Sequence, residues 1–346
     1  MNVDEIIASL LAGRSLDDAA IEVAAAHLLD AAADLTQKAN LLRALSVKGE
    51  TAEEIAGFVT VFLRHAVRPP LDLATLGRPA MDVCGTGGDK LGLFNISTAS
   101  MFLLAGGGVA VVKHGNRGIT SKSGSADVLE ALGVPVNLPP ERFAECVRKN
   151  GAGFMLAPQY HPAFKAVAPV RAQLATEGVR TIFNLIGPLM NPLQPPAQLI
   201  GVYDPALPPV YAAILRALGR RSAWAVHGHV PGSQGMDEIS TLGTTHILAL
   251  HDGTITEMTE QVPLPAPLLA ELKGGDAITN AGIIEGILTG ALKGAQRDIV
   301  LANAAAGFRV TGLADGWDAG LRLANEALDS GRALTVLQTL RAFAPA

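Results

Sequence analysis

Met81–Asp127, with the sequence MDVCGTGGDKLGLFNISTASMFLLAGGGVAVVKHGNRGITSKSGSAD, is the stretch that decides the fold. Its apolar runs and polar or glycine-rich loops follow the order strand, loop, helix, strand, loop, helix. We expect the strands to begin at Met81 and to cover 109–112, and the helices to cover 99–105 and 126–132. Because the carboxyl ends of parallel strands meet at one edge of an open sheet, both loops should face the edge where such sheets bind ligands.

Both loops have the chemistry of an anion site. Gly85-Thr86-Gly87-Gly88-Asp89 is rich in glycine, which leaves backbone N–H groups open to a phosphate. Asn95-Ile96-Ser97-Thr98 precedes an apolar run, so its polar residues are N-cap candidates for a helix whose positive end attracts an anion. Lys113, Arg117 and Lys122 add cationic side chains. A glycine loop alone is equally typical of a tight turn, and neither the P-loop pattern nor the dinucleotide fingerprint is present. Together, however, these features predict a ligand with several phosphates.

Length and composition limit the classes of protein. The 346 residues are enough for one large or two moderate domains, and a net charge of −5 gives no basic footprint for nucleic acid. Two cysteines, Cys84 and Cys146, are too few for a disulfide framework and are expected to be buried thiols. The first residues do not resemble a signal peptide, and no apolar run has the length of a membrane span. We therefore expect a cytoplasmic protein with small-molecule partners, without nucleic acid or membrane.

The chain divides into a helical start and an α/β remainder. Residues 1–67 show helical periodicity without a strand candidate, and Thr51 is predicted to cap one of the helices. We predict a helical domain over 1–72, joined by helices from about 163–190, and an α/β domain over 73–346. Further strands are predicted, together with a helix between two of them, which indicates a mainly parallel sheet. These strands are 154–157, 199–203, 223–227 and 246–250, and the helix is 208–218.

Three further groups of residues each allow a structural and a functional interpretation. The adjacent acids Asp237 and Glu238 are typical of a solvated turn, but beside a polyphosphate site they suit Mg²⁺. His114 is suited to general-base chemistry or to a hydrogen bond with the backbone. Arg171 lies on a predicted helix, where its guanidinium suits a surface salt bridge or the carboxylate of a ligand.

The motifs GTGGD (85–89), NIST (95–98) and KHGNR (113–117), in this order and spacing, resemble the anthranilate phosphoribosyltransferase family. The resemblance continues almost to the end of the chain through SKSGSADVLEALG (121–133), RTIFNLIGPLMNP (180–192), MDEIS (236–240) and QRDIVLANAA (296–305). It implies the fold shared by nucleoside phosphorylases and class IV phosphoribosyltransferases, with a dimer contact on the helical domain. The implied reaction is attack of the anthranilate nitrogen on phosphoribosyl pyrophosphate (PRPP) with Mg²⁺, which forms phosphoribosylanthranilate for tryptophan synthesis.

The resemblance also assigns residues to each ligand. It assigns PRPP to Gly85, Gly88, Asp89, Asn95, Ser97, Thr98, Lys113, His114, Gly115, Asn116, Arg117, Ser121 and Ser125. It assigns anthranilate to Gly85, Asn116 and Arg171, and Mg²⁺ to Ser97, Asp237 and Glu238. No general acid or base is assigned, because Lys113 and the metal-bound acids are expected to stabilise the charge of the leaving pyrophosphate.

Three departures from the family pattern leave alternatives open. Leu93 replaces a hydroxyl residue, 171–180 is about three residues longer than usual, and 229–235 is also lengthened. Because of the longer segment, Arg180 is the alternative to Arg171. The alternative functions are transfer to another aromatic acceptor, pyrimidine nucleoside phosphorolysis and nucleic-acid binding. The last requires a basic face and fits poorly with this acidic chain and its Asp237-Glu238 pair.

Overall fold

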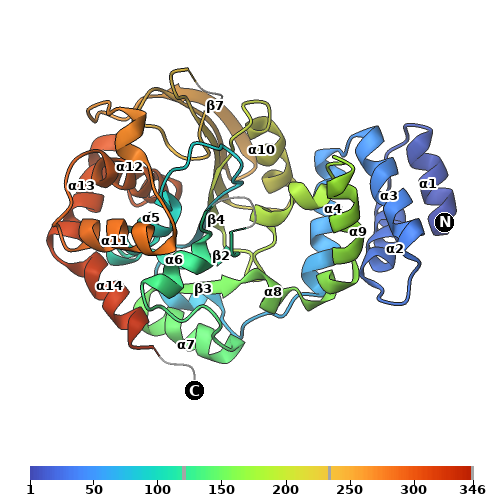
Figure 1. Cartoon of the computed structure of the whole chain (residues 1–346), viewed down its shortest axis with the longest axis horizontal. Coiled ribbons are helices and arrows are strands. Elements are labelled where there is room, and N and C mark those ends of the chain that lie inside the picture. The colour runs from blue at the N-terminus through green and yellow to red at the C-terminus, as the bar shows by residue number, and fades with distance from the viewer. Residues whose placement is uncertain (119–121, 233–234, 344–346) are drawn as a thin grey trace.

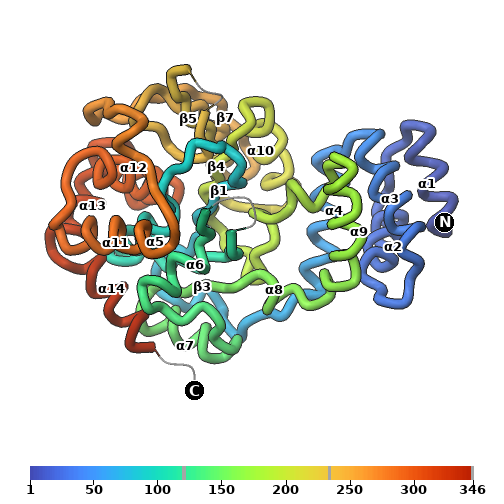
Figure 2. The backbone as a smooth tube through the Cα atoms, in the orientation of Figure 1, coloured from blue at the N-terminus to red at the C-terminus, as the bar shows by residue number. Residues whose placement is uncertain are grey.

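The computed structural model describes residues 1–118, 122–232 and 235–343. Figure 1 shows a group of N-terminal helices at one end of the molecule and a larger body with a central sheet at the other. The chain crosses between these parts after α4, before α9 and again after α9 (Figure 2). The predicted α/β class with a helical N-terminal domain is therefore confirmed.

Polar caps begin the first four helices, α1 (Val3–Leu11), α2 (Asp18–Leu29), α3 (Leu35–Lys48) and α4 (Ala52–Arg64). The predicted cap at Thr51 is present: its hydroxyl accepts from the backbone N–H of Glu54, whose carboxylate accepts from the N–H of Thr51. The Glu54 side chain is almost fully buried and also accepts from Leu16 N and Lys48 Nζ, at 2.9 and 2.6 Å. One carboxylate thus ties α4 to the preceding segments.

A later segment completes the helical part. The segment predicted to hold helices from about 163–190 begins with a 3₁₀ turn (Pro162–Ala166) and α9 (Ala168–Thr176), and the short α8 (Ala157–Tyr160) precedes it. α9 packs against α3, and Glu177, within the lengthened segment, forms an ion pair with Arg43 of α3. Buried residues of α1–α4 and α9 share one core with α10 (Pro208–Ala217). The boundary at residues 72 and 73 stays a prediction.

The central sheet has the strand order β3-β2-β1-β4-β5-β6-β7. Its strands are β1 (Ala80–Gly85), β2 (Ala110–Gly115), β3 (Ala152–Leu156), β4 (Ala197–Gly201), β5 (Ser222–Gly228), β6 (Thr245–His251) and β7 (Thr254–Glu260). Pairing is parallel from β3 to β5, as predicted, whereas β6 and β7 are antiparallel. Strand β7 was not predicted, because its pattern is largely polar at an exposed edge. The Asp252-Gly253 turn before it is the sequence signal that indicates this hairpin.

Alternate residues of the central strands enter two different cores. Leu199 and Trp224 belong to the core that contains α5 (Ile96–Gly106) and α12 (Ala295–Val310). Ile200 and Ala223 belong to the core shared by α10 and the helical domain. The remaining helices are α6 (Ser125–Ala131), α7 (Pro140–Asn150), α11 (Ala277–Leu288), α13 (Trp317–Asp329) and α14 (Arg332–Arg341). No helix in the described parts of the chain is long and apolar enough to cross a membrane.

Candidate active site

The predicted loops converge where the strand order reverses. The chain proceeds from β1 through β2 to β3 on one side and from β4 to β5 on the other, so the switch point lies between β1 and β4. Gly85 and Gly201 are paired at the carboxyl ends of these two strands. Since open α/β sheets bind ligands at such a point, the topology favours this edge as the site.

Asp237 and Glu238 lie at this edge because three glycines leave room for their backbone and side chains. A Cβ on Gly201 would lie 1.6 Å from the backbone oxygen of Asp237, and one on Gly85 would lie 2.2 Å from Asp237 Oδ2. Gly228 exchanges two backbone hydrogen bonds with Met236 and would likewise clash with Glu238 O at 2.5 Å. Because a glycine ends each of β1, β4 and β5, residues 236–238 can lie directly over the ends of these strands. Gly201 and Gly228 were not predicted as site residues.

Asp237 contacts the glycine loop. Its Oδ2 accepts from Gly87 N at 2.7 Å, and its carboxyl group shares a hydrogen bond with that of Asp89. Burial raises the pKa of Asp237, and the neighbouring Asp89 raises this pKa further. The structure thus brings two predicted site residues, Asp89 and Asp237, into direct contact.

Glu238 occupies the N-terminus of α5. Its Oε1 accepts from Ser97 N at 3.1 Å, so the carboxylate lies at the positive end of the helix dipole. Asn95 is at the predicted N-cap position, but its side chain makes no cap hydrogen bond and instead bonds Ser123 and Asn280. Burial, followed by the charge of Asp237, raises the pKa of Glu238.

Lys113 lies beneath the same helix end. Its ammonium donates to Val83 O and, at 3.3 Å, to Ser97 Oγ, and its side chain is almost fully buried. The nearby carboxylates of Asp82 and Glu238 have their pKa lowered by this charge, although burial outweighs it and leaves each pKa raised. Lys113 therefore supplies a fixed positive charge that water screens little.

The acid pair fits Mg²⁺ as part of a shell that substrate completes. The described residues contain no group of three or more His, Cys, Asp or Glu side chains able to hold a metal ion. Mg²⁺ commonly uses only one or two protein carboxylates and completes its shell with water and substrate phosphates. Burial is the main cause that raises the pKa of Asp89, Asp237 and Glu238, and like charge raises the pKa of Asp237 and Glu238 further, so a divalent cation would favour the charged forms of these groups.

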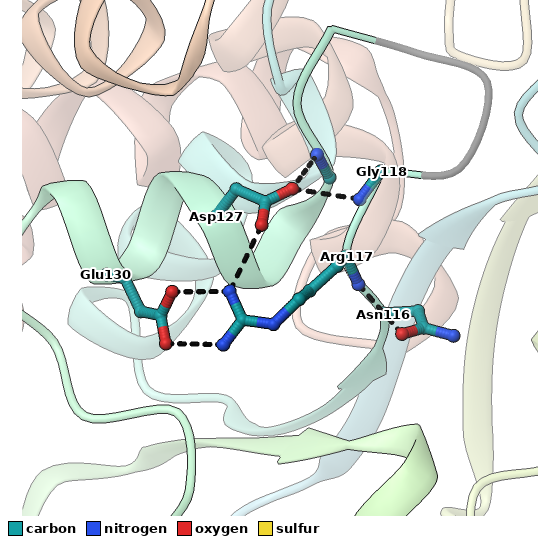
Figure 3. Close-up of polar contacts among 6 residues, drawn as sticks. Asn116, Arg117, Gly118, Asp127 and Glu130 are labelled. Atoms are coloured by element: carbon teal, nitrogen blue, oxygen red, sulfur yellow. Dashed lines mark hydrogen bonds and ion pairs between the residues drawn. The ribbon is translucent and has the colours of Figure 1, made fainter.

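Arg117 in the second loop is already engaged by carboxylates. Figure 3 shows its guanidinium held by both oxygens of Glu130, at 2.5 and 2.6 Å, and by Asp127 at 3.2 Å. Asp127 Oδ2 also accepts from Gly118 N and Gly124 N, both at 2.8 Å, and so closes the base of the loop. Asn116 is exposed beside it, Ser125 begins α6, and the predicted contact Ser121 lies outside the described residues.

Two predicted PRPP contacts, His114 and Thr98, have buried side chains. Burial, with a smaller effect from His161, lowers the pKa of His114 to about 3, so its ring is neutral at neutral pH. Its backbone N–H donates to Asp82, while His114 Nε2 and Thr98 Oγ1 have no hydrogen-bond partner in the described parts of the chain. A neutral ring with so low a pKa is a poor general base.

Arg171 and Arg180 have different surroundings. The guanidinium of Arg171 is half-buried over the ring of Phe183, 4.8 Å from its centroid, with no hydrogen-bond or ion-pair partner among the described residues. Ring contacts continue from Phe183 through Phe164 and His161 to His114 at the end of β2. Arg180 is exposed and donates to Tyr203 Oη at 3.2 Å. Since Tyr203 lies against Gly88, Arg180 is linked to the glycine loop.

Buried amides hold the site together, and the sequence did not single them out. Asn191 donates to Asp82 and to Val112 O, and Asn303 accepts from Ile239 N at 2.9 Å, next to the acid pair. Asn280 joins the two predicted PRPP loops. Their only sequence signal is a polar residue within an apolar helical or loop segment.

Two cavities of the described structure lie away from the candidate site. One of about 450 Å³ and one of about 290 Å³ share Arg68 and Gln194. The larger is lined by residues that immediately precede β1 and β4, including Pro79 and Pro196. It is therefore at the opposite edge of the sheet from the candidate site.

Comparison with known proteins agrees with this geometry. Residues 4–66 match the glycosyl transferase family helical bundle domain, and residues 77–334 match the glycosyl transferase family a/b domain. Anthranilate phosphoribosyltransferase of Moorella thermoacetica is 44% identical over 97% of both chains. The crystal structure of the Thermus thermophilus enzyme of that name has a TM-score of 0.88 at 38% identity over 98% of both chains. The Saccharomyces cerevisiae enzyme, solved in complex with PRPP and Mg, has a TM-score of 0.85 at 26% identity over 99% of this chain and 97% of its own. The chain belongs to the anthranilate phosphoribosyltransferase family.

Proposed function

We propose that this protein transfers the phosphoribosyl group of PRPP to the amino group of anthranilate, with release of pyrophosphate. The observation that carries the proposal is the meeting of the glycine loop, the N-terminus of α5 and the Asp237-Glu238 pair at the switch point of the sheet. Full-length similarity to enzymes of this activity supports the same reaction. The reaction is a step in tryptophan synthesis.

The proposed roles follow from charge and position. Bound Mg²⁺ would neutralise the charge of the pyrophosphate, and we assign it to Asp237, Glu238 and Ser97. The α5 N-terminus and the buried Lys113 add fixed positive potential at the same edge. No residue needs to activate the nucleophile, because an aromatic amine has a free lone pair at neutral pH. The protein's task is then to align the amine with the anomeric carbon and to stabilise the leaving group.

We propose the phosphate-binding role for the accessible groups of the two loops. Gly85, Gly88, Asn95, Ser97, Gly115, Asn116 and Ser125 are exposed or half-buried around the site. The side chains of Thr98, Lys113 and His114 are buried. We therefore propose that these residues contribute to phosphate binding through backbone groups or through charge. Arg117 would have to leave Glu130 to contact a phosphate, and we therefore assign it first to holding the loop.

We also propose a homodimer formed through the helical domain. Large apolar side chains are exposed on its helices, among them Leu11, Leu35 and Val47 at 66, 48 and 79%. Burial of such side chains against a second copy would remove apolar surface from water. Light scattering after size exclusion should give twice the mass of one chain, and a monomer would contradict the proposal.

The direct test is loss of anthranilate fluorescence. Purified protein should remove the signal only when PRPP and Mg²⁺ are both present, and omission of either should stop the decay. No decay, with PRPP and Mg²⁺ still raising the melting temperature, would indicate transfer to another aromatic acceptor. Leu93 and the lengthened segment 171–180 are the departures that would then require examination.

Arg171→Ala should raise KM for anthranilate by about 10-fold or more while KM for PRPP stays within about twofold. The reason is that Arg171 is half-buried without a described partner, so the substrate carboxylate can supply its counter-charge. Arg180→Ala should have the smaller effect, because that guanidinium already bonds Tyr203. Arg216→Ala, an exposed change on α10, is the control. A larger effect at Arg180 would transfer the carboxylate role to that residue.

A further inference from the structure

We infer that Asn280 of α11 is a positioning residue for PRPP, which holds the two phosphate-binding loops in a fixed relation. The inference rests on the proposed function, because it concerns the same site. Asn280 lies about 190 residues after the first loop, and no motif for phosphate binding includes it. Its importance comes from three segments that meet at its side chain.

The amide of Asn280 is fully used. Nδ2 donates to Asn95 Oδ1 and to Ser123 Oγ, both at 2.9 Å, and Oδ1 accepts from Gly275 N at 2.7 Å. Only 1% of the residue is exposed. Asn95 and Ser123 also bond each other, with Ser123 Oγ donating to Asn95 Oδ1 at 3.2 Å. Three polar side chains from separate parts of the chain thus form one closed cluster.

The segment 273–275, just before α11, bonds the backbone of residues 92–93 in the first loop. Gly274 N donates to Gly92 O at 2.9 Å, and Leu93 pairs with Lys273. A Cβ on Gly274 would lie 2.6 Å from Phe94 Cα and 2.5 Å from Asn280 Oδ1, so only glycine allows this approach. Asp276 then caps α11 through Thr279 N, which fixes the direction in which Asn280 enters the cluster.

The partners of Asn280 connect it to both halves of the phosphate site. Asn95 immediately precedes α5, and within α5 the Ser97 N–H donates to the carboxylate of Glu238. Ser123 lies two residues before Ser125, the first residue of α6. Without the amide, the segments before α5 and α6 keep only the direct bonds between Asn95 and Ser123 and lose the two bonds that anchor both to α11. PRPP is assigned to residues of both elements, whereas the charged partner assigned to anthranilate is Arg171, which lies on α9.

We therefore predict that a change at Asn280 affects PRPP binding and leaves anthranilate binding nearly unchanged. Asn280→Ala should raise the dissociation constant and KM of Mg²⁺-PRPP by about 10-fold or more, with KM for anthranilate within about twofold. Asn280→Asp should act in the same direction, since it keeps an acceptor for Gly275 N but loses the donor to Asn95 and Ser123. Asn325→Ala is the matched control, because Asn325 is a half-buried amide on α13 that bonds Leu321 O. It should leave both constants unchanged.

The experiment measures Mg²⁺-PRPP binding by calorimetry and both KM values by fluorescence on the full-length protein. A lower melting temperature with unchanged PRPP binding would show a purely structural role and overturn the inference. Equal rises in both KM values would also overturn it. If Asn280→Ala does not fold, Ser123→Ala removes one partner more mildly and should weaken PRPP binding alone. A wild-type protein that binds Mg²⁺-PRPP but does not consume anthranilate contradicts the proposed acceptor and leaves this binding test intact, whereas no PRPP binding overturns both.

Discussion

The double substitution Asp237→Asn, Glu238→Gln is expected to lower kcat by about 100-fold or more. Both carboxylates lie at the switch point, with Asp237 on Gly87 N and Glu238 on Ser97 N. The amide replacements keep shape and an acceptor oxygen for each of these bonds, but they remove the negative charge that would hold Mg²⁺. Initial rates over a range of Mg²⁺ concentrations measure the effect.

The melting temperature distinguishes loss of the metal site from misfolding in this double variant. Burial and like charge raise the pKa of both groups, which means that the folded protein disfavours their charged forms. Neutral amides should therefore leave the melting temperature of the ligand-free protein unchanged or higher. Glu257→Gln, an exposed acid on β7, is the matched control and should leave kcat unchanged. Full activity with an unaltered Mg²⁺ requirement in the double variant would contradict the metal assignment.

Gly201→Ala is expected to reduce the free energy of unfolding by about 3 kcal/mol or more and to abolish turnover. The new Cβ would lie 1.6 Å from the backbone oxygen of Asp237 and 2.3 Å from its carbonyl carbon. Backbone cannot rotate away as a side chain can, so either β4 or the acid segment must move. Urea unfolding and the fluorescence assay measure the two effects.

Substitutions at two other glycines serve as comparisons for Gly201→Ala. Gly85→Ala meets chiefly the side-chain oxygen of Asp237, so it should impair turnover with a smaller loss of stability. Gly282→Ala, within α11, meets nothing within 4 Å and should stabilise the protein by about 0.5–1 kcal/mol through helix propensity. Equal effects at Gly201 and Gly282 would contradict the crossing of the acid segment over β4.

Local patterns were sufficient to predict much of the architecture. Apolar runs of the right length located β1, β2 and α5, and Thr51 was recognised as the start of α4 from its side chain and the acids after it. These features depend on neighbouring residues: strands and helices have characteristic periods, and a cap bonds within one turn. The motifs also predicted which loops follow the strand ends, because glycine and hydroxyl residues are typical of loops at the ligand-binding edge of such a sheet.

Tertiary structure alone decided which polar groups satisfy one another. Sequence could not reveal that Glu238, rather than Asn95, meets the α5 N-terminus, or that Arg117 is held by Glu130. Nor could it reveal that Gly201 makes room for Asp237 or that Asn280 joins Asn95 to Ser123. Except for the Arg117 pair, these contacts join residues far apart in the chain, and each depends on distances of a few ångströms set by packing of the sheet and its helices. The sequence by itself predicted the loops of the candidate site and determined the family to which the chain belongs. Folding determined how the charges of these loops are paired, because hydrogen bonds and desolvation act through space and not along the chain.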